Sequence, residues 1–382
     1  MKRERIILIM ALVGSLCTFS CAESGTESRD AGLDSHVSSD ADADGDVDAD
    51  SGADADTDTD AGTQDAAPCE YKWRMVFKTP GRLKAVWGSS SKDIFAVGSG
   101  PSDLCLVVHY DGESWSVMDT PEANELNAVW GSSNSDVFAV GGKDNEGSVL
   151  HYDGDTWSSI KCRDAFNMIG VWGRNAGDVF IIGSMSGPPG ARHGQIFHYD
   201  GNECYMILEE QGISLIDVWG TQDNKVYAVG TLSPLSPLLY SYEGGEWMEV
   251  DSGIEDAAIF MKLWGKRSND LFMNAVLRAP DGDSVLRYDG NEWKILVSVS
   301  QEKLTEIWGT SGSDVYFASA TMSGTVISGC NIYHYDGGTT SEMMSSDEWA
   351  VTGLWANEKN KAYAAGYIID EDAGVILHYS CD

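Results

Sequence analysis

The sequence predicts an all-β fold: a seven-bladed β-propeller closed by an N-terminal strand that completes the last blade. A phrase centred on "VWG" occurs seven times, with its tryptophan repeated every 42–47 residues, and "HYDG" with its variants also occurs seven times. Such a period, made of short apolar runs and glycine-rich turns, is typical of four-stranded propeller blades. A strand-like segment, residues 70–77, precedes the first repeat, and the last repeat lacks a fourth strand.

The first 20 residues are typical of an export signal. Three basic residues within 2–5 precede an apolar run, residues 6–19, that is too short to span a bilayer. The ending "TFSC" resembles a bacterial lipobox, which implies a signal peptide (1–20) and acylation of Cys21, with a palmitate-type lipid, as the mature N-terminus. Simple cleavage that leaves a free Cys21 is the alternative. Ala22 is not the aspartate that retains enteric lipoproteins at the inner membrane, so the resemblance implies an outer-membrane lipoprotein, periplasmic or surface-exposed.

Residues 21–67 are expected to be a disordered tether rich in Asp and Ala. Fifteen acidic side chains and a single arginine fall within residues 21–66. Because this segment has almost nothing to bury, no core can offset the entropy lost on ordering. The stretch "DADADG" resembles the start of a calcium loop, which leaves weak calcium binding at Asp40, Asp42 and Asp44 as an alternative. The twelfth loop position is Ser51 rather than a glutamate, which favours the tether.

The remainder, residues 68–382, is expected to form the propeller, with four strands in each repeat. The first strand ends at the repeated tryptophan, and the second, as in "DIFAVG", is apolar on both faces, as expected between neighbouring sheets. The third ends at "HYDG", whose Asp-Gly favours a hairpin turn. The fourth alternates, as in "WSVM", and suits an outer strand with one face in water.

The cysteines suggest how the ring is fastened. Residues 70–77 would supply the missing strand of the last blade, which places Cys69 and Cys381 beside the same interrupted turn and predicts a disulfide between them. Cys105 and Cys162 fall on loops of one face in adjacent blades, so they form a second candidate pair. Two other cysteines, 204 and 330, have no evident partner, and the absence of C-x-x-C argues against zinc.

The units "VWGSSxxDVFAVG…HYDGxxW" resemble the tandem repeats of predicted propeller lipoproteins from myxobacteria and related bacteria. The resemblance covers residues 70–382 and weakens in the sixth repeat, where "HYDGGTTSEMM" lacks the outer tryptophan. It implies the propeller fold and an envelope address, and it implies no activity.

Composition and motifs favour binding over catalysis. The net charge is −35, which argues against nucleic acid and anionic membrane surfaces as partners. The histidines, tryptophans and aspartates that recur at fixed repeat positions are attributed to the scaffold: the tryptophans would fill the space between blades, and the aspartates would cap the turn before the second strand. The repeated histidines would lie far apart around the rim, so they could not bind one metal ion. No G-x-S-x-G motif is present and no other catalytic set stands out, so enzymatic activity is left open.

A ligand is expected on the face that carries the variable loops between second and third strands. The longest of these loops are residues 184–197 and 320–333. Variable loops on a rigid ring are where recognition usually resides. The polar side chains there that the repeat does not explain are Arg192, His193, Arg278, Asp281 and Asp283.

The sequence is compatible with two functions. The first is an outer-membrane-anchored lipoprotein whose propeller is a non-catalytic binding or scaffold module for a protein or a glycan. The alternative is a secreted polysaccharide-active hydrolase or lyase on a propeller scaffold, which rests on fold analogy alone.

Overall fold

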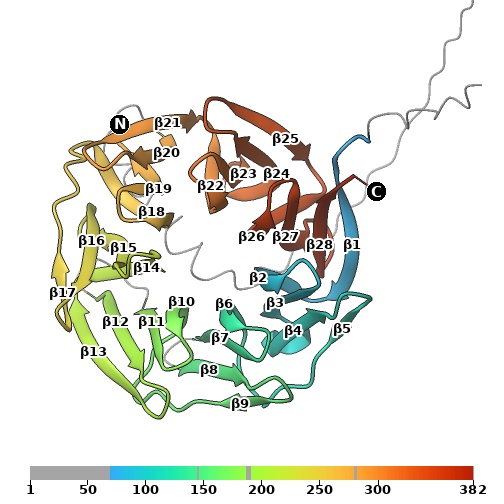
Figure 1. Ribbon diagram of the computed structural model, residues 1–382, viewed down its shortest axis with the longest axis horizontal. Coiled ribbons are helices and arrows are strands. Elements are labelled where there is room, and N and C mark those ends of the chain that lie inside the picture. Colours follow the sequence, from blue (N-terminus) through green and yellow to red (C-terminus); the bar gives the residue numbers. More distant parts are fainter. Residues whose placement is uncertain (1–68, 144–145, 186–190, 279–281, 382) are drawn as a thin grey trace, which may run out of the picture. The chain divides into compact units, whose positions relative to one another are not determined.

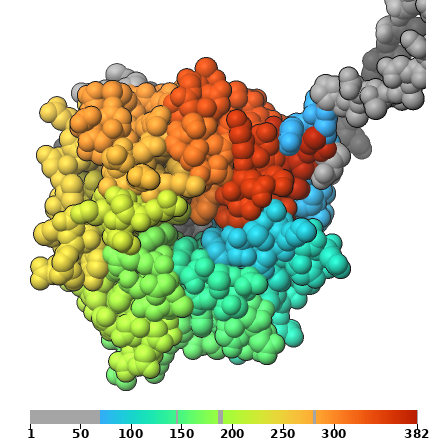
Figure 2. All heavy atoms as spheres, viewed as in Figure 1, coloured from blue at the N-terminus to red at the C-terminus, as the bar shows by residue number. Residues whose placement is uncertain are grey.

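Seven four-stranded antiparallel sheets form a ring, which confirms the predicted seven-bladed β-propeller (Figure 1). This computed structural model describes residues 69–143, 146–185, 191–278 and 282–381. The chain travels once around the ring, so that its first and last strands lie side by side (Figure 2). Among the described residues, no helix is long and apolar enough to cross a membrane.

Blades 1 to 4 follow one another along the chain, each running from its innermost to its outermost strand. Blade 1 also contains the single-turn 3₁₀ helix η1 (Pro101–Asp103). The strands of blades 1 and 2 are β2 (Arg82–Ser90), β3 (Asp93–Ser99), β4 (Cys105–Tyr110), β5 (Trp115–Val117), β6 (Leu126–Ser133), β7 (Asp136–Lys143), β8 (Glu146–Tyr152) and β9 (Trp157–Ser159). Those of blades 3 and 4 are β10 (Met168–Asn175), β11 (Asp178–Met185), β12 (His193–Tyr199), β13 (Cys204–Gln211), β14 (Ile213–Gly220), β15 (Val226–Leu232), β16 (Ser236–Glu243) and β17 (Glu246–Glu249).

Blades 5 to 7 repeat this order, except that the outer strand of blade 7 comes from the N-terminal end of the propeller. The strands of blades 5 and 6 are β18 (Ala257–Arg267), β19 (Asp270–Leu277), β20 (Gly282–Tyr288), β21 (Trp293–Val299), β22 (Glu302–Ser311), β23 (Asp314–Ser323), β24 (Val326–Tyr335) and β25 (Thr340–Ser346). Those of blade 7 are β26 (Trp349–Glu358), β27 (Lys361–Ile368), β28 (Ala373–Ser380) and β1 (Lys72–Pro80).

The ring closes through the pairing of β1 with β28. Trp73 lies opposite Tyr379, which is the register that Trp115 has with Tyr110 in blade 1. The N-terminal strand therefore takes the place of a fourth strand, and it covers the edge of β28 that would otherwise be open. A disulfide joins Cys69 and Cys381, as predicted, and fastens the two ends of the propeller.

The core consists mainly of second strands sandwiched between neighbouring blades. In β3, Ile94 and Phe95 have no solvent exposure, and the equivalent Phe138 and Phe180 are also fully buried. Each innermost strand carries a β-bulge between the residues four and two positions before its tryptophan, such as Leu83 and Ala85 in β2. Bulges increase the local twist of a strand, so a bulge at one place in every blade helps the ring to close symmetrically.

One predicted variable loop is not a loop. Residues 320–333 belong largely to β23 and β24, which extend into a long hairpin with two residues, 324 and 325, between the strands. Gly324 has φ +66°, the left-handed conformation that a tight hairpin turn requires. The additional residues of blade 6 therefore lengthen its strands instead of enlarging a recognition loop.

Candidate functional site

The repeated histidines and aspartates pair within their own blades. His109 Nε2 lies 2.7 Å from Asp93 Oδ1, and Ser89 donates a hydrogen bond to the other carboxylate oxygen. The same contact recurs as His151–Asp136, His198–Asp178 and His334–Asp314, and Arg287 takes the histidine's place beside Asp270. The aspartates thus tie the second strand to the third, beyond capping a turn. Within the described ranges, no group of three or more His, Cys, Asp or Glu could hold a metal ion.

Five of the seven repeated tryptophans lie between blades, as the sequence predicts. Each ring packs against the glycine that follows the tryptophan of the next blade, so closely that a Cβ at Gly220 would lie 2.1 Å from a ring atom of Trp172. Only glycine permits this approach. The five contacts are Trp355 on Gly88, Trp87 on Gly131, Trp130 on Gly173, Trp172 on Gly220 and Trp264 on Gly309.

Trp219, in blade 4, departs from this arrangement. Its next-blade glycine is Gly265, but the side chain of Leu271 occupies the adjoining space. A Cβ at Gly265 would lie 2.7 Å from Leu271 Cδ2, and its three nearest atoms belong to Asp270 and Leu271. The other blades place a shorter or β-branched residue at the position of Leu271. Leu271 therefore keeps Trp219 out of the space between blades. Trp219 Nε1 donates a hydrogen bond to Gly265 O over 2.8 Å instead.

Trp308, in blade 6, departs for a related reason. Blade 7 has Ala356 where the other six blades have glycine, so a methyl group occupies the place that the indole would take. Trp308 Nε1 donates to Ala356 O over 2.8 Å, which holds the ring at the inner end of the blade. Trp219 and Trp308 are both partly exposed, and their rings meet edge to face with centroids 5.3 Å apart and planes at 87°.

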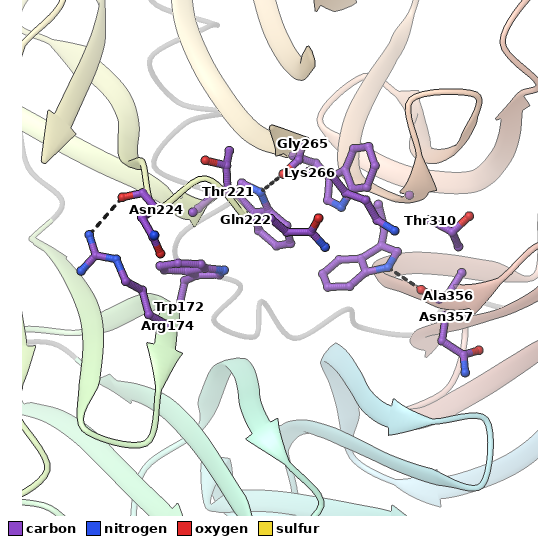
Figure 3. Close-up of a pocket in the computed structure, with 16 residues that line it drawn as sticks. Trp172, Arg174, Thr221, Gln222, Asn224, Gly265, Lys266, Thr310, Ala356 and Asn357 are labelled. Carbon is purple, nitrogen blue, oxygen red and sulfur yellow. Dashed lines mark hydrogen bonds between the residues drawn. The ribbon is translucent and has the colours of Figure 1, made fainter. Parts of the chain in front are cut away.

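These two indoles line a cavity of about 480 Å³ at the inner ends of blades 3 to 7 (Figure 3). We call this cavity the axial pocket. Its aromatic wall also includes Trp172 and Trp264. Its polar wall combines residues from the ends of innermost strands with residues from the turn between β14 and β15. The strand residues are Arg174, Lys266, Thr310 and Asn357, and the turn residues are Thr221, Gln222 and Asn224. None of its described lining residues is acidic.

Most polar groups of the pocket wall are uncharged or already engaged. Arg174 donates to Asp178 Oδ2 over 2.7 Å and to Asn224 O over 3.2 Å, so its charge is balanced. The side-chain amides of Gln222 and Asn357 are exposed and have no protein hydrogen-bond partner among the described residues. They are therefore available to a ligand, as is the exposed ammonium group of Lys266.

Three charged side chains form a cluster on the innermost strands of blades 4, 5 and 6. Lys262 Nζ lies 3.2 Å from Glu306 Oε2 and 3.8 Å from Asp217 Oδ1. Each carboxylate also accepts a backbone N–H, from Leu263 to Asp217 and from Ile307 to Glu306. Burial raises the pKa of both carboxyl groups, and the positive charge of Lys262 opposes that rise. The other four blades have alanine or glycine at this position.

The residues predicted as a ligand face lie in two separate blades. In blade 3, Arg192 is buried, and His193 begins β12 with its Nδ1 4.0 Å from Glu209 Oε1. In blade 5, Arg278 donates hydrogen bonds to the carbonyls of Ala257 and Leu235.

Asp283, also in blade 5, is buried and is bonded to other groups of the protein. Its carboxylate lies 2.9 Å from Lys303 Nζ and accepts the N–H of Leu304 over 3.0 Å, and burial raises its pKa. The remaining predicted site residues lie outside the described residues: Asp281, the lipid-attachment residue Cys21, and Asp40, Asp42 and Asp44 of the calcium alternative.

The predicted pairing of Cys105 with Cys162 is wrong. Cys162 is bonded to Cys204, with the two Cα atoms 5.1 Å apart, whereas Cys105 is free and near Thr120. Cys204 lies opposite Tyr199, where blade 2 has Trp157 opposite Tyr152.

The presence of Cys204 in place of an outer tryptophan changes how blades 2 and 3 are held together. The outer tryptophan of a blade packs against the preceding blade, as Trp157 does on Phe95 with ring centroids 6.2 Å apart. Cys204 replaces that packing between blades 2 and 3 with a covalent bond to Cys162. Cys330, for which the sequence suggested no partner, is buried and free.

Comparisons with known proteins support the propeller fold and nothing further. No protein-family model matches the chain, and no curated protein matches its sequence. Among solved structures, "YCF48 bound to D1 peptide" is similar with a TM-score of 0.57 at 14% identity, over 83% of this chain and 98% of that chain. YCF48 from Cyanidioschyzon merolae has a TM-score of 0.57 at 12% identity, over 81% and 98%. The WD40 propeller domain of Doa1 has a TM-score of 0.57 at 10% identity, over 81% and 97%.

Proposed function

We propose that this protein is a non-catalytic binding module whose ligand enters the axial pocket. The observation that carries the proposal is the placement of Trp219 and Trp308, which leave the packing between blades and line a cavity instead. Large aromatic side chains beside a few polar groups in a cavity of roughly 300–1,000 Å³ are typical of ligand sites.

The composition of the pocket favours binding over reaction chemistry. Among its described lining residues there is no carboxylate, histidine or cysteine that could act as acid, base or nucleophile. A glycan and a protein segment are the two ligand classes that such a pocket suits. A second cavity, of about 520 Å³, lies on the variable-loop face beside Leu104, Glu122 and Glu146, and it offers a surface for a protein partner.

The envelope address is part of the same proposal. Acylation of Cys21 would hold the protein at the outer membrane, and the acidic segment that follows would separate the propeller from the lipid surface. Replacing Cys21 with serine tests this, with metabolic labelling by palmitate as the readout. We expect label in the wild-type protein and none in the Cys21→Ser variant, which should leave the membrane fraction. Equal labelling of both would contradict the lipid anchor.

The alternative, a polysaccharide-active enzyme, is favoured by one observation. Asp217 and Glu306 are two carboxyl groups with raised pKa values on either side of Lys262. Paired carboxyl groups of this kind can act as acid and base in glycoside cleavage. Release of reducing ends from polysaccharides, lost in Asp217→Asn and Glu306→Gln variants, would establish the alternative and overturn a purely binding role.

Binding by the full chain, purified in detergent, tests the main proposal. The protein is applied to glycan arrays and to proteins extracted from the bacterial envelope, with Trp308→Ala and Trp219→Ala variants in parallel. We expect saturable binding without turnover that both variants weaken. Val117→Ala, an exposed position on the outer rim, is the control and should bind as the wild type does. Binding that ignores both tryptophans would move the ligand to another surface.

A further inference from the structure

We infer that the axial pocket binds a neutral saccharide, with Trp219 and Trp308 as its stacking platform and with Leu271 and Ala356 as the residues that present this platform. The inference rests on the proposed function and names the ligand class of the same site.

The two indoles offer the ligand ring surface and no hydrogen bond. Their N–H groups are already engaged with Gly265 O and Ala356 O, both over 2.8 Å. These bonds also fix the orientation of the rings. The rings are perpendicular, so one presents a face beside the edge of the other and together they form an aromatic corner. The C–H-rich face of a pyranose ring suits such a surface, because aromatic faces are electron-rich and apolar.

The polar wall suits hydroxyl groups. Gln222 and Asn357 each provide an amide that can donate and accept. A sugar hydroxyl likewise both donates and accepts, so side-chain amides match it well. The Thr310 hydroxyl donates to Asp314, so it can only accept from a ligand. In Figure 3, Gln222 and Asn357 lie apart, with Asn357 next to Ala356.

The charges favour a neutral ligand. Lys266 is the only described cation of the lining without a protein partner, because Arg174 is paired with Asp178. Outside residues 2–5 and 21–66, the chain has 44 acidic and 21 basic side chains, and this excess repels anions. A cationic ligand would find no carboxylate among the described lining residues. A neutral saccharide is not repelled by the excess negative charge, and it needs no carboxylate as a counter-ion.

Leu271 and Ala356 act as positioning residues. Each occupies space beside a next-blade backbone position, and in the five other blades that space is filled by a tryptophan. Ala356→Gly and Leu271→Val should therefore let Trp308 and Trp219 fold back between the blades. Both changes remove only apolar atoms, and both leave the tryptophans in the chain.

The experiment uses the full chain in detergent and neutral oligomers of glucose, xylose and N-acetylglucosamine, with oligomers of uronic acid as charged counterparts. Calorimetry and tryptophan fluorescence give the affinities. We expect at least one neutral oligomer to bind, with affinity falling roughly tenfold or more in Trp308→Ala. We expect a similar fall in Ala356→Gly and Leu271→Val, with a blue shift in fluorescence as the indoles become buried.

Matched substitutions in the same two blades are the controls. Ala350→Gly in blade 7 and Leu277→Val in blade 5 make the same chemical changes at buried positions, each at the other end of the same strand from Ala356 or Leu271. Both should retain wild-type affinity. Should Ala356→Gly fail to fold, Trp308→Phe, which shortens the platform, replaces it and should weaken binding several-fold.

The outcomes distinguish the saccharide inference from the proposed function. Tryptophan-dependent binding of a protein, or stronger binding of uronic acid oligomers than of neutral ones, would overturn the saccharide inference and leave the proposed function standing. An absence of any tryptophan-dependent binding would overturn both. Unchanged affinity in Ala356→Gly and Leu271→Val would overturn the positioning role.

Discussion

The indole rings of Trp219 and Trp308 meet edge to face with their centroids 5.3 Å apart, although they belong to blades 4 and 6. The tryptophan of the blade between them, Trp264, remains packed on Gly309. The repeat therefore contains two kinds of tryptophan, and they should respond differently to substitution.

Trp264→Ala should be far more destabilising than Trp308→Ala. Trp264 is 2% exposed and fills the space between two blades, so its removal should lower the free energy of unfolding by about 3–5 kcal/mol. Trp308 is partly exposed, and its removal enlarges a cavity that already exists. We therefore expect the free energy of unfolding to fall by about 1–2 kcal/mol. Urea denaturation of both variants measures the difference. Equal losses would show that Trp308 is a core residue.

The Cys162–Cys204 disulfide should contribute substantially to stability. It closes a loop of 42 residues, and chain-entropy reasoning gives about 4 kcal/mol for a loop of that length. A variant with serine at both positions should lose that amount in chemical denaturation. Cys105→Ser changes a free, half-buried cysteine and is the control, with an expected change within about 0.5 kcal/mol. A variant that combines Cys162→Ser with Cys204→Trp should recover part of the loss, because an indole again fills the position of the outer tryptophan.

Lys262→Met should destabilise the protein in a pH-dependent way. Asp217 and Glu306 have pKa values raised by burial, so the folded state binds more protons than the unfolded state and stability falls as pH rises above their ordinary values. Loss of the neighbouring cation raises both pKa values further. We expect a loss of about 3–5 kcal/mol at pH 7 and a smaller loss at pH 5.

Denaturation at the two pH values measures this effect, with Lys266→Met as the control. Lys266 lies on the same strand but is exposed, so its removal should change stability little at either pH. A loss in Lys262→Met that does not vary with pH would show that the lysine acts through packing alone.

Asp314→Asn should have the opposite pH dependence. Burial tends to raise the pKa of Asp314, but hydrogen bonds from His334 and Thr310 outweigh burial and lower it. The stabilisation is therefore present at neutral pH and is lost as pH falls through the lowered pKa. We expect Asp314→Asn to cost about 1–3 kcal/mol at pH 7. The two unfolding curves should converge in acid, below the ordinary 3.8 of an aspartic acid. A constant difference down to low pH would contradict this account.

Much of the fold was predictable because each blade repeats one local solution. The fixed distance from tryptophan to second strand and the Asp-Gly turns are local signals, and the unmatched segment 70–77 predicted the strand that closes the ring. The Cys69–Cys381 disulfide followed from that closure. Cys204 also had a signal, since it stands where other repeats have the outer tryptophan, but its bond to Cys162 depends on how far the chain after β9 reaches toward blade 3.

The axial pocket was not predictable in the same way. Ala356 and Leu271 are visible in the sequence as departures from the repeat. Their effect on the packing of a tryptophan can be seen only when the neighbouring blade is in place. The cluster of Asp217, Lys262 and Glu306 likewise required the inner strands of three blades to be brought side by side.

The sequence by itself determined the number of blades, the order of strands within them and the closure of the ring, because backbone pairing and apolar periodicity are properties of short segments. Only the tertiary structure decided which tryptophans are scaffold and which are exposed. That choice depends on the space left between adjacent blades, and at Gly265 and Ala356 a few atoms of Leu271 and of one methyl group settle it.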